Sequence, residues 1–362
     1  MARKPEGQLR RGWTTGACAA AATRAAYEAL LSGSFPDPVS ITLPRGQQPA
    51  FALAFQEIGE NLARAGIIKD AGDDPDVTHQ AMIISTVRAG PVGQGVTFTA
   101  GEGVGTVTKA GLPLAVGEPA INPVPRRMIR DNVAELAQKF GAAGDVAVEI
   151  SVPGGSELAK KTWNPRLGIL GGLSILGTTG VVIPFSCSAW IHSIHRGIDV
   201  ARAERQDHVA GCTGSTSEKA VQDLYGLPET AMLDMGDFAG GLLKYLAKHP
   251  LPKLTIGGGF GKLSKLAQGH LDLHSGRSQV SLDWLARRVK DIGGSEDLMN
   301  QVQAANTALE VLGLAQDNGL PLANEIARLA QKTAQNLVSD QTQVQVVVFD
   351  RTGTLVGRSH DD

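Results

Sequence analysis

The chain has 362 residues, 42% of them hydrophobic and 19% charged, and its formal net charge at pH 7 is −2. This length and composition are typical of a globular protein with two domains, and the small net charge and 4% aromatic content disfavour a nucleic-acid partner. Three widely spaced cysteines predict a reducing cytoplasm rather than a disulfide framework or a zinc site. We expect neither export nor a membrane span, because no apolar run reaches 18 residues.

The first part of the chain predicts a mixed α+β domain. An alanine-rich helix is expected after Thr14 or Thr15, either of which can cap its start, and Gly33 marks its end. A second helix is expected to begin at Pro125, which suits the first helical position, and to continue over 126–141. Strand-like runs punctuated by glycine and proline lie at 40–46, 81–90, 95–109 and 145–155.

The second part predicts a parallel sheet covered by helices. Apolar runs ending in or near glycine alternate with helical patterns, which is typical of βαβ crossovers. The runs lie at 166–170, 208–214, 230–236 and 253–259. Helical patterns then fill most of 278–338, and a strand or hairpin is expected over 343–359. We place the domain boundary near residue 160, which gives an α+β domain over 1–160 and a Rossmann-like α/β domain over 161–362.

Glycine-rich loops follow these predicted strands. In an open α/β sheet, ligands bind beyond the carboxyl ends of the strands, where bare backbone amides can hold a polar group. The same glycines can simply serve tight turns and close packing, and Asp234 can bind ribose hydroxyls or only cap a turn. Neither G-x-G-x-x-G nor a P-loop is present. The candidate cofactor-binding residues are Gly171, Gly172, Thr178, Thr179, Asp234, Gly236, Gly257, Gly258 and Gly259.

Acidic residues are concentrated in one stretch of the first domain. Asp70, Asp73, Asp74, Asp76 and His79 lie within ten residues, so their carboxylates repel one another unless a cation, proton or donor compensates. The stretch is either a site that steers a cation or supplies a base, or a solvated turn. Asp73, Asp74 and His79 are the catalytic candidates.

Arginines stand at both predicted helix starts. Arg126 and Arg127 would oppose the helix dipole unless an anion binds there, and carboxylates match arginine forks well. Solvation or pairing with Glu118 or Asp131 is the alternative. The candidate substrate-binding residues are Arg11, Thr14, Thr15, Asn122, Arg126 and Arg127. The histidine pairs lack the partners of a metal site, and no covalent nucleophile is indicated.

Several long motifs resemble those of a known family. They are GWTTGACAAAA, DAGDDPDVTH, GEGVGTVTKAGL, GEPAINPVPRRMI, NPRLGILGGLSILGTTGVVIPFS and GGGFGKLSKLAQGHLDLHS, in that order between about residues 9 and 285. Together they are similar to the cobalt-precorrin-5B C1-methyltransferases of cobalamin biosynthesis. Beyond residue 285 the resemblance is weak.

The resemblance implies transfer of the methyl group of S-adenosylmethionine to C1 of a cobalt corrinoid, which gives cobalt-precorrin-6A. We therefore expect residues 1–160 to bind the corrinoid and residues 161–362 to bind S-adenosylmethionine, with the cobalt carried by the substrate and no protein-bound metal. The alternatives are a nucleotide-dependent dehydrogenase and a non-enzymatic corrinoid scaffold. The sequence does not decide the oligomeric state.

Overall fold

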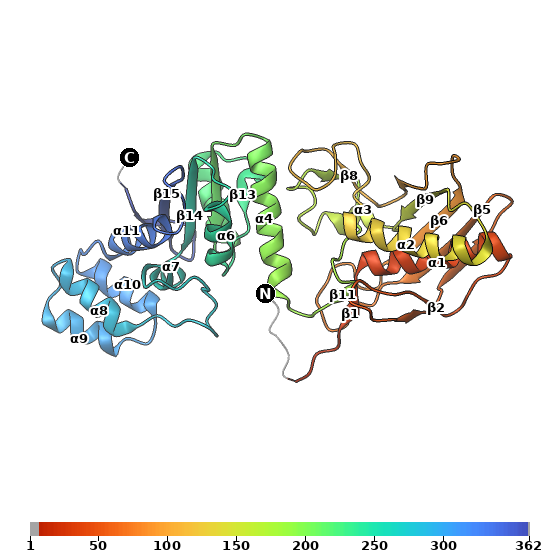
Figure 1. Cartoon of the computed structure of the whole chain (residues 1–362). Coiled ribbons are helices and arrows are strands. Elements are labelled where there is room, and N and C mark those ends of the chain that lie inside the picture. Colours follow the sequence, from red (N-terminus) through yellow and green to blue (C-terminus); the bar gives the residue numbers. More distant parts are fainter. Residues whose placement is uncertain (1–6, 361–362) are drawn as a thin grey trace. The chain divides into compact units, whose positions relative to one another are not determined.

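The structure is a computed structural model that describes residues 7–360. The chain has a mixed α/β fold and divides into two compact units between Cys187 and Ser188 (Figure 1). The division falls later than the predicted boundary at residue 160. Its cause is backbone pairing: N of Leu173 donates to O of Gly103 at 2.8 Å, and N of Ile175 donates to O of Ala120 at 2.8 Å. Residues 161–187 therefore belong to the first unit.

A five-stranded sheet forms the centre of the first unit. Its order is β4-β5-β6-β9-β7, antiparallel except for the parallel pair β7 and β9. The strands are β4 (Phe55–Ile58), β5 (Leu62–Ile68), β6 (Met82–Ala89), β9 (Val146–Ser151) and β7 (Val96–Ala100). Two-stranded ladders join β1 (Gly12–Trp13) to β11 (Val181–Val182), β2 (Val39–Ser40) to β3 (Ala50–Phe51), and β8 (Thr106–Val107) to β10 (Ile169–Leu170). A short helix, α3 (Gly155–Ala159), follows β9.

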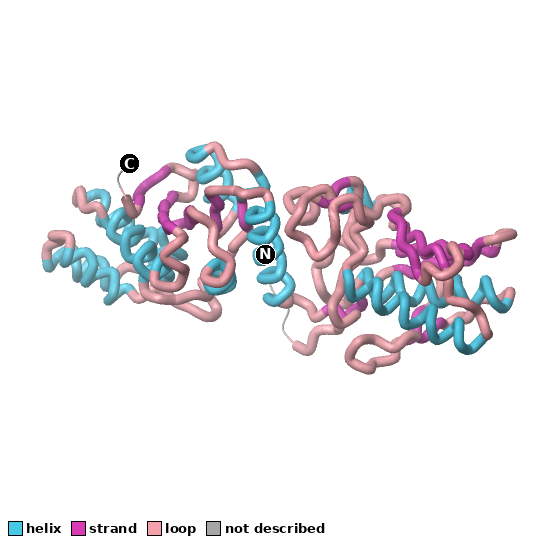
Figure 2. Tube along the Cα trace, turned by 45° about the horizontal axis from the view of Figure 1, so that its top comes forward, coloured by secondary structure: helices cyan, strands magenta, loops and turns pink. Residues whose placement is uncertain are grey.

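Two helices of this unit, α1 (Thr15–Ser32) and α2 (Pro123–Phe140), lie side by side and run parallel (Figures 1 and 2). Three places fix their direction. A Cβ on Gly16 would lie 2.6 Å from Cγ of Pro125, Arg24 donates to Asn132, and Lys139 pairs with Glu28. The alanines of α1 are almost fully buried, which lets this helix pack closely on the sheet and on α2. Both amino ends therefore lie at the same place.

The start of α1 is as predicted, and that of α2 is not. Thr14 caps α1 by accepting from N of Ala17 at 3.2 Å, and Gly33 ends the helix with a φ of 81°. Helix α2 begins at Pro123 rather than at Pro125, because Asn122 is extended and its carbonyl accepts the first helical bond, from N of Arg126. Arg126 and Arg127 are thus the fourth and fifth residues of the helix.

The second unit contains a mostly parallel sheet with the order β13-β12-β14-β15-β16. The strands are β12 (His208–Cys212), β13 (Met232–Leu233), β14 (Lys253–Gly259), β15 (Gln343–Phe349) and the antiparallel β16 (Leu355–Arg358). The predicted strand at 166–170 is not part of this sheet; its residues 169–170 form β10, which pairs with β8 in the first unit. Counted from β12, the strand order is 2-1-3-4-5, so the chain reverses direction across the sheet between β12 and β14.

Helices connect and cover these strands. They are α4 (Cys187–Ala203), α5 (Ser215–Tyr225), the 3-10 turn η1 (Glu229–Ala231), α6 (Ala239–Leu246), α7 (Phe260–Ala267), α8 (Leu282–Asp291), α9 (Glu296–Ala304), α10 (Ala308–Asp317) and α11 (Leu322–Gln335). The last four confirm the helical region predicted over 278–338. Figure 1 shows α8, α9 and α10 gathered as a group.

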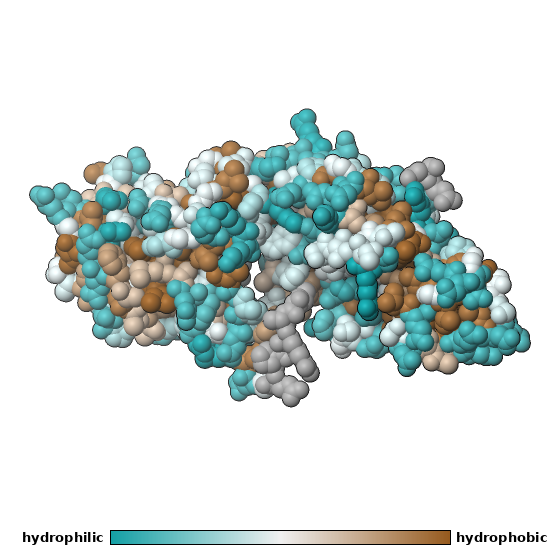
Figure 3. All heavy atoms as spheres, turned by 180° about the vertical axis from the view of Figure 1, so that it is seen from behind, coloured by the Kyte–Doolittle hydropathy of each residue, from teal (hydrophilic) through white to brown (hydrophobic). Residues whose placement is uncertain are grey.

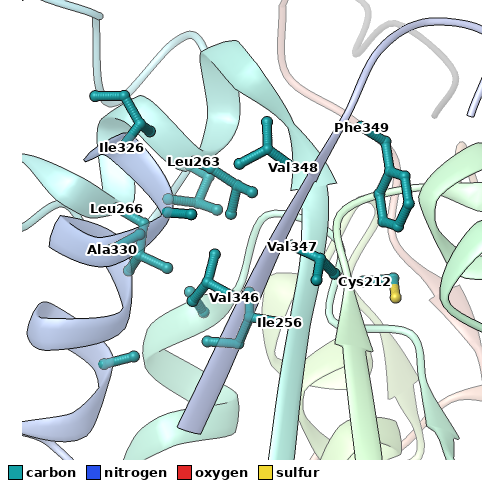
Figure 4. Close-up of a cluster of buried hydrophobic side chains, with 14 of the residues drawn as sticks. Cys212, Ile256, Leu263, Leu266, Ile326, Ala330, Val346, Val347, Val348 and Phe349 are labelled. Carbon is teal, nitrogen blue, oxygen red and sulfur yellow. The ribbon is translucent and has the colours of Figure 1, made fainter. Parts of the chain in front are cut away.

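Side-chain alternation on β15 separates two layers of the core (Figure 4). Val346 and Val348 point toward α7 and α11, whereas Val347 and Phe349 point to the opposite side, where Cys212 lies. This period of two is expected for a strand that is buried on both faces.

The molecular surface is mixed in hydropathy. On the face shown in Figure 3, hydrophobic residues are interspersed with hydrophilic ones. Among the described residues, no helix combines the length and the apolar character that crossing a membrane requires.

Candidate functional site

The acidic stretch at 70–79 forms a turn, here called the acidic turn, that is attached to the segment before α1. Arg10 binds both carboxylate oxygens of Asp70, and this hydrogen bonding holds the pKa of Asp70 below its usual value. N of Arg10 donates to Oδ2 of Asp73 at 2.6 Å, and N of Asp73 donates to O of Arg10 at 3.0 Å. N of Trp13 donates to O of Asp70 at 2.7 Å. The mutual repulsion of the carboxylates is thus offset by specific donors.

A buried lysine anchors the other half of the acidic turn. Lys69 is 1% exposed, and its Nζ lies 2.7 Å from Oδ2 of Asp76, while N and Oγ1 of Thr78 each donate to Oδ1 at 2.7 Å. Burial acts to raise the pKa of Asp76, but Lys69 and Thr78 together hold it below its ordinary value. Sequence analysis missed Lys69, since lysine is rarely buried unless it is paired.

The two remaining catalytic candidates of the acidic turn are already engaged. Oδ1 of Asp74 accepts from N of Phe185 at 2.7 Å, which fastens the turn to the segment after β11. Nδ1 of His79 accepts from N of Ala71 at 3.1 Å, so the proton of the neutral ring lies on Nε2. His79 can therefore donate a hydrogen bond from Nε2, and protonation of Nδ1 would break the bond from Ala71.

Residues 171–180, the glycine loop, lie across the starts of both helices. N of Leu176 donates to Oγ1 of Thr15 at 2.9 Å, and N of Gly16 donates to O of Leu176 at 2.9 Å. On the α2 side, N of Asn122 donates to O of Ile175 at 2.9 Å. A Cβ on Gly177, whose φ is 130°, would overlap Oγ1 of Thr14. The loop thus joins the two amino ends into one surface, here called the helix-start site.

The predicted residues of the glycine loop differ in surroundings. Gly172 is buried, and a Cβ there would overlap the backbone of Gly103, so this glycine serves close packing. Gly171 is exposed with a φ of 85°, and no other described atom would contact its Cβ. Thr178 is exposed, and Oγ1 of Thr179 bonds locally to Val181.

The arginines of the helix-start site have two distinct roles. Nε of Arg126 donates to O of Ile121 at 2.7 Å, and its guanidinium pairs with Glu118 at 2.7 Å and lies over the ring of Phe98. Arg126 is therefore committed to the protein. Arg11 and Arg127 are exposed, and their side chains have no hydrogen-bond or ion-pair partner within residues 7–360. Helices α1 and α2 also have no acidic residue in their first turns, which suits the binding of an anion there.

The other predicted ligand-binding residues lie in the second unit, at the carboxyl edge of its sheet. Asp234 and Gly236 follow β13, and O of Asp234 accepts from the indole of Trp190 at 2.8 Å. Gly257 and Gly258 are followed by Gly259, the last residue of β14. A Cβ on Gly257 would lie 2.5 Å from Cγ2 of Val221, so that glycine lets α5 approach the sheet.

Gly259 differs, because no other described atom would lie within 4 Å of a Cβ there. It precedes α7 as its N-cap residue. Sequence analysis missed three polar residues at this edge, Thr213, Asp237 and Lys262. Their proximity depends on the strand order, which no local pattern reveals. Among the described residues no group of three or more potential metal-ligating side chains occurs.

Comparisons with known proteins agree in the family that they identify. The family model CbiD matches residues 2–184, and the model described as CbiD, C-terminal domain matches residues 272–360. A Paramagnetospirillum magneticum protein named cobalt-precorrin-5B C(1)-methyltransferase is 61% identical, covering 98% of this chain and 99% of its own length. A Brucella anthropi protein of the same name is 61% identical, covering 97% and 96%.

A solved structure also matches. It is the crystal structure of the cobalamin biosynthesis protein cbiD from Archaeoglobus fulgidus, which is 29% identical, with a TM-score of 0.40 and coverage of 70% of this chain and 78% of that one. The family resemblance inferred from the motifs is confirmed by the family models and the curated relatives, and the chain belongs to the CbiD family.

Proposed function

We propose that this chain is a cytoplasmic C-methyltransferase that transfers the methyl group of S-adenosylmethionine to C1 of cobalt-precorrin-5B and so forms cobalt-precorrin-6A. The observation that carries the proposal is an identity of 61% over nearly the whole chain with proteins named for this activity. The cobalt is part of the substrate, so the protein itself needs no resident metal.

The helix-start site supports the binding of a many-acid macrocycle by the first unit. A ring that bears several acetate and propionate groups needs cationic and N–H donors, and arginine forks match carboxylates bidentately. Arg11 and Arg127 are exposed without protein partners among the described residues, and they accompany two parallel helix starts. Asn122 makes no side-chain cap at α2 in the described structure, which leaves its amide available. Arg126 supports the site by holding the segment before α2.

The second unit supports the binding of S-adenosylmethionine. Its strand order is that of a doubly wound, Rossmann-like domain, and ligands of such sheets bind where the order reverses. Here that place lies between β12 and β14, whose carboxyl ends carry residues 212–214 and 257–259. Asp234, after the neighbouring β13, is suited to accept hydrogen bonds from ribose hydroxyls.

The proposed reaction asks mainly for positioning. The nucleophilic ring carbon must stand in line with the methyl carbon and the sulfonium at about 3–3.5 Å, and much of the rate comes from that alignment. No covalent enzyme intermediate is needed. Asp73, Asp74 and His79 remain the candidates for steadying positive charge or handling a proton. Because Nε2 of His79 carries the proton of the neutral ring, its role is that of a donor toward an acidic group of the substrate.

A single-turnover experiment tests the proposed function. The purified full chain is mixed with cobalt-precorrin-5B and S-adenosylmethionine labelled in its methyl group. We expect one label per corrinoid at C1 and an equal amount of S-adenosylhomocysteine. A reaction with S-adenosylhomocysteine in place of the donor is the control. If the corrinoid binds but acquires no label, the chain is a scaffold and the proposal fails.

A further inference from the structure

Three loops at the carboxyl edge of the second sheet meet at one lysine. Lys262 is the third residue of α7, which follows β14. Its Nζ donates to O of Thr213, after β12, at 2.8 Å, and lies 3.0 Å from Oδ1 of Asp237, in the loop after β13. Since β13, β12 and β14 are neighbours in the sheet, these residues gather beside the place where the strand order reverses.

Two of these groups retain unused hydrogen-bonding capacity. Thr213 is 7% exposed, and its hydroxyl has no hydrogen-bond partner in the described part of the chain. Oδ1 of Asp237 is enclosed and ion-paired to Lys262, whereas Oδ2 is not enclosed and accepts no hydrogen bond from any described residue. Both are polar atoms of largely buried residues that still reach the surface, so both are placed to bind a ligand.

The surrounding backbone leaves space for that ligand. A Cβ on Gly258 would lie 2.7 Å from Oγ1 of Thr213, so glycine at this position lets the threonine side chain pack against β14. Gly259, the N-cap of α7, makes no side-chain cap, and no described atom would lie within 4 Å of a Cβ on it. The first amides of α7 have no partner within the helix, and Lys262 of the same turn reaches O of Thr213.

We propose that Thr213, Asp237, Lys262 and the start of α7 bind the amino-acid end of S-adenosylmethionine. This proposal rests on the proposed function. The α-carboxylate would accept hydrogen bonds from the Thr213 hydroxyl, the Lys262 ammonium and the first amides of α7. The α-ammonium would donate to Oδ2 of Asp237, while Oδ1 stays paired with Lys262. A zwitterion matches this pairing of opposite charges 3.0 Å apart, whereas a ribose diol is neutral and would form weaker hydrogen bonds with a helix start or a lysine.

The site is tested by comparing two ligands that differ in this end alone. S-adenosylhomocysteine carries the amino acid, and 5′-methylthioadenosine lacks it. Isothermal titration of the full chain should give S-adenosylhomocysteine an affinity about tenfold or more above that of 5′-methylthioadenosine, because charged hydrogen bonds are strong. Thr213→Val, Asp237→Asn and Lys262→Met should each reduce this ratio about three- to tenfold and leave the affinity for 5′-methylthioadenosine within about twofold.

Matched controls lie at the opposite edge of the sheet. Thr333→Val and Lys332→Met alter α11 near Gln335, whose side chain bonds to O of Thr342 just before β15. These variants should keep the wild-type ratio. Thermal unfolding of all variants identifies any that are misfolded, and Thr213→Val is close to isosteric, so it keeps the test decisive.

The outcomes separate this proposal from the proposed function. If S-adenosylhomocysteine binds but the three variants keep the wild-type ratio, the amino-acid end lies elsewhere and this inference alone fails. If the two ligands bind the wild type equally, the inference also fails. If neither ligand nor S-adenosylmethionine binds, S-adenosylmethionine is not the methyl donor, and both the proposed function and this site are refuted.

Discussion

The buried ion pair beneath the acidic turn can be tested by removing each partner separately. Nζ of Lys69 lies 2.7 Å from Oδ2 of Asp76, and the two side chains are 2% and 25% exposed. The carboxylate also accepts two hydrogen bonds from Thr78. The partners are therefore unequally supported: without the lysine, Asp76 still has Thr78 and water, whereas without the carboxylate an ammonium is left inside the core.

This inequality predicts different costs for the two replacements. Asp76→Asn leaves a buried ammonium without its counter-charge, which should lower the free energy of unfolding by about 3–5 kcal/mol. Lys69→Met removes one charged hydrogen bond from a carboxylate that can still reach water, at a cost of about 1–2 kcal/mol. The double variant should resemble Lys69→Met, so the coupling energy should equal the cost of Asp76→Asn, about 3–5 kcal/mol.

Hydrogen exchange measured by mass spectrometry at increasing urea is the appropriate assay, because peptides from β5 and β6 report on the first unit alone. Exchange in β14 and β15 of the second unit serves as the internal control and should not change. If Lys69→Met costs as much as Asp76→Asn, or if the two costs simply add, the burial of the ammonium does not govern the stability of the acidic turn.

Three further predictions concern other parts of the chain. Burial lowers the pKa of His208 from 6.5 to about 4, and a nearby lysine adds a smaller effect. The folded state therefore favours the neutral imidazole, and the fold is most stable above pH 6.5, where the ring is neutral in the unfolded chain as well. Up to about 2 kcal/mol is lost as the pH falls from 6.5 to 4, and His208→Gln should flatten that slope in urea titrations. Arg127→Gln should weaken corrinoid binding about five- to tenfold in absorbance titrations and leave the melting temperature unchanged. Arg126→Gln should instead lower the free energy of unfolding by about 1–3 kcal/mol. The reverse pattern would refute the assignment of Arg127 to the ligand and of Arg126 to the fold. Gly177→Ala should lower the free energy of unfolding by about 2–3 kcal/mol, because its Cβ would overlap the N-cap threonine of α1. Gly171→Ala, whose Cβ meets no other described atom, should lower it by only about 1 kcal/mol. Equal shifts in melting temperature would contradict this difference.

Local signals in the sequence predict the elements whose ends are set locally. Helix α1 is found because a capping threonine and a left-handed glycine bracket an alanine run, and strands β12 to β15 because glycine breaks follow apolar runs. The run at 166–170 has the same local pattern but pairs with β8 instead. A short apolar run carries no information about its partner, since pairing is decided by contacts far away in sequence.

The same reason explains which site residues could be found. Arg11, Arg127 and the acidic turn are visible because their charge is unusual for their position in the chain. Thr213 and Lys262 are ordinary residue types, and they become a candidate site only because β12 and β14 are adjacent. Arg126 was grouped with Arg127, yet the early start of α2 directs it to carbonyls of the preceding segment.

The glycines of the two candidate sites separate into two physical classes, and this bears on how each site works. At Gly172, Gly257 and Gly258 a side chain would overlap a neighbour, so glycine at these positions permits close packing. At Gly171 and Gly259 a side chain would meet no described atom, so packing gives no reason for glycine there. Gly171 adopts a φ of 85°, which explains it, but Gly259 has a φ of −74° that any residue tolerates. Gly259 is the N-cap residue of α7, a position that favours glycine, and the bare main chain there also lets a ligand approach the first amides of a helix whose third residue, Lys262, reaches Thr213.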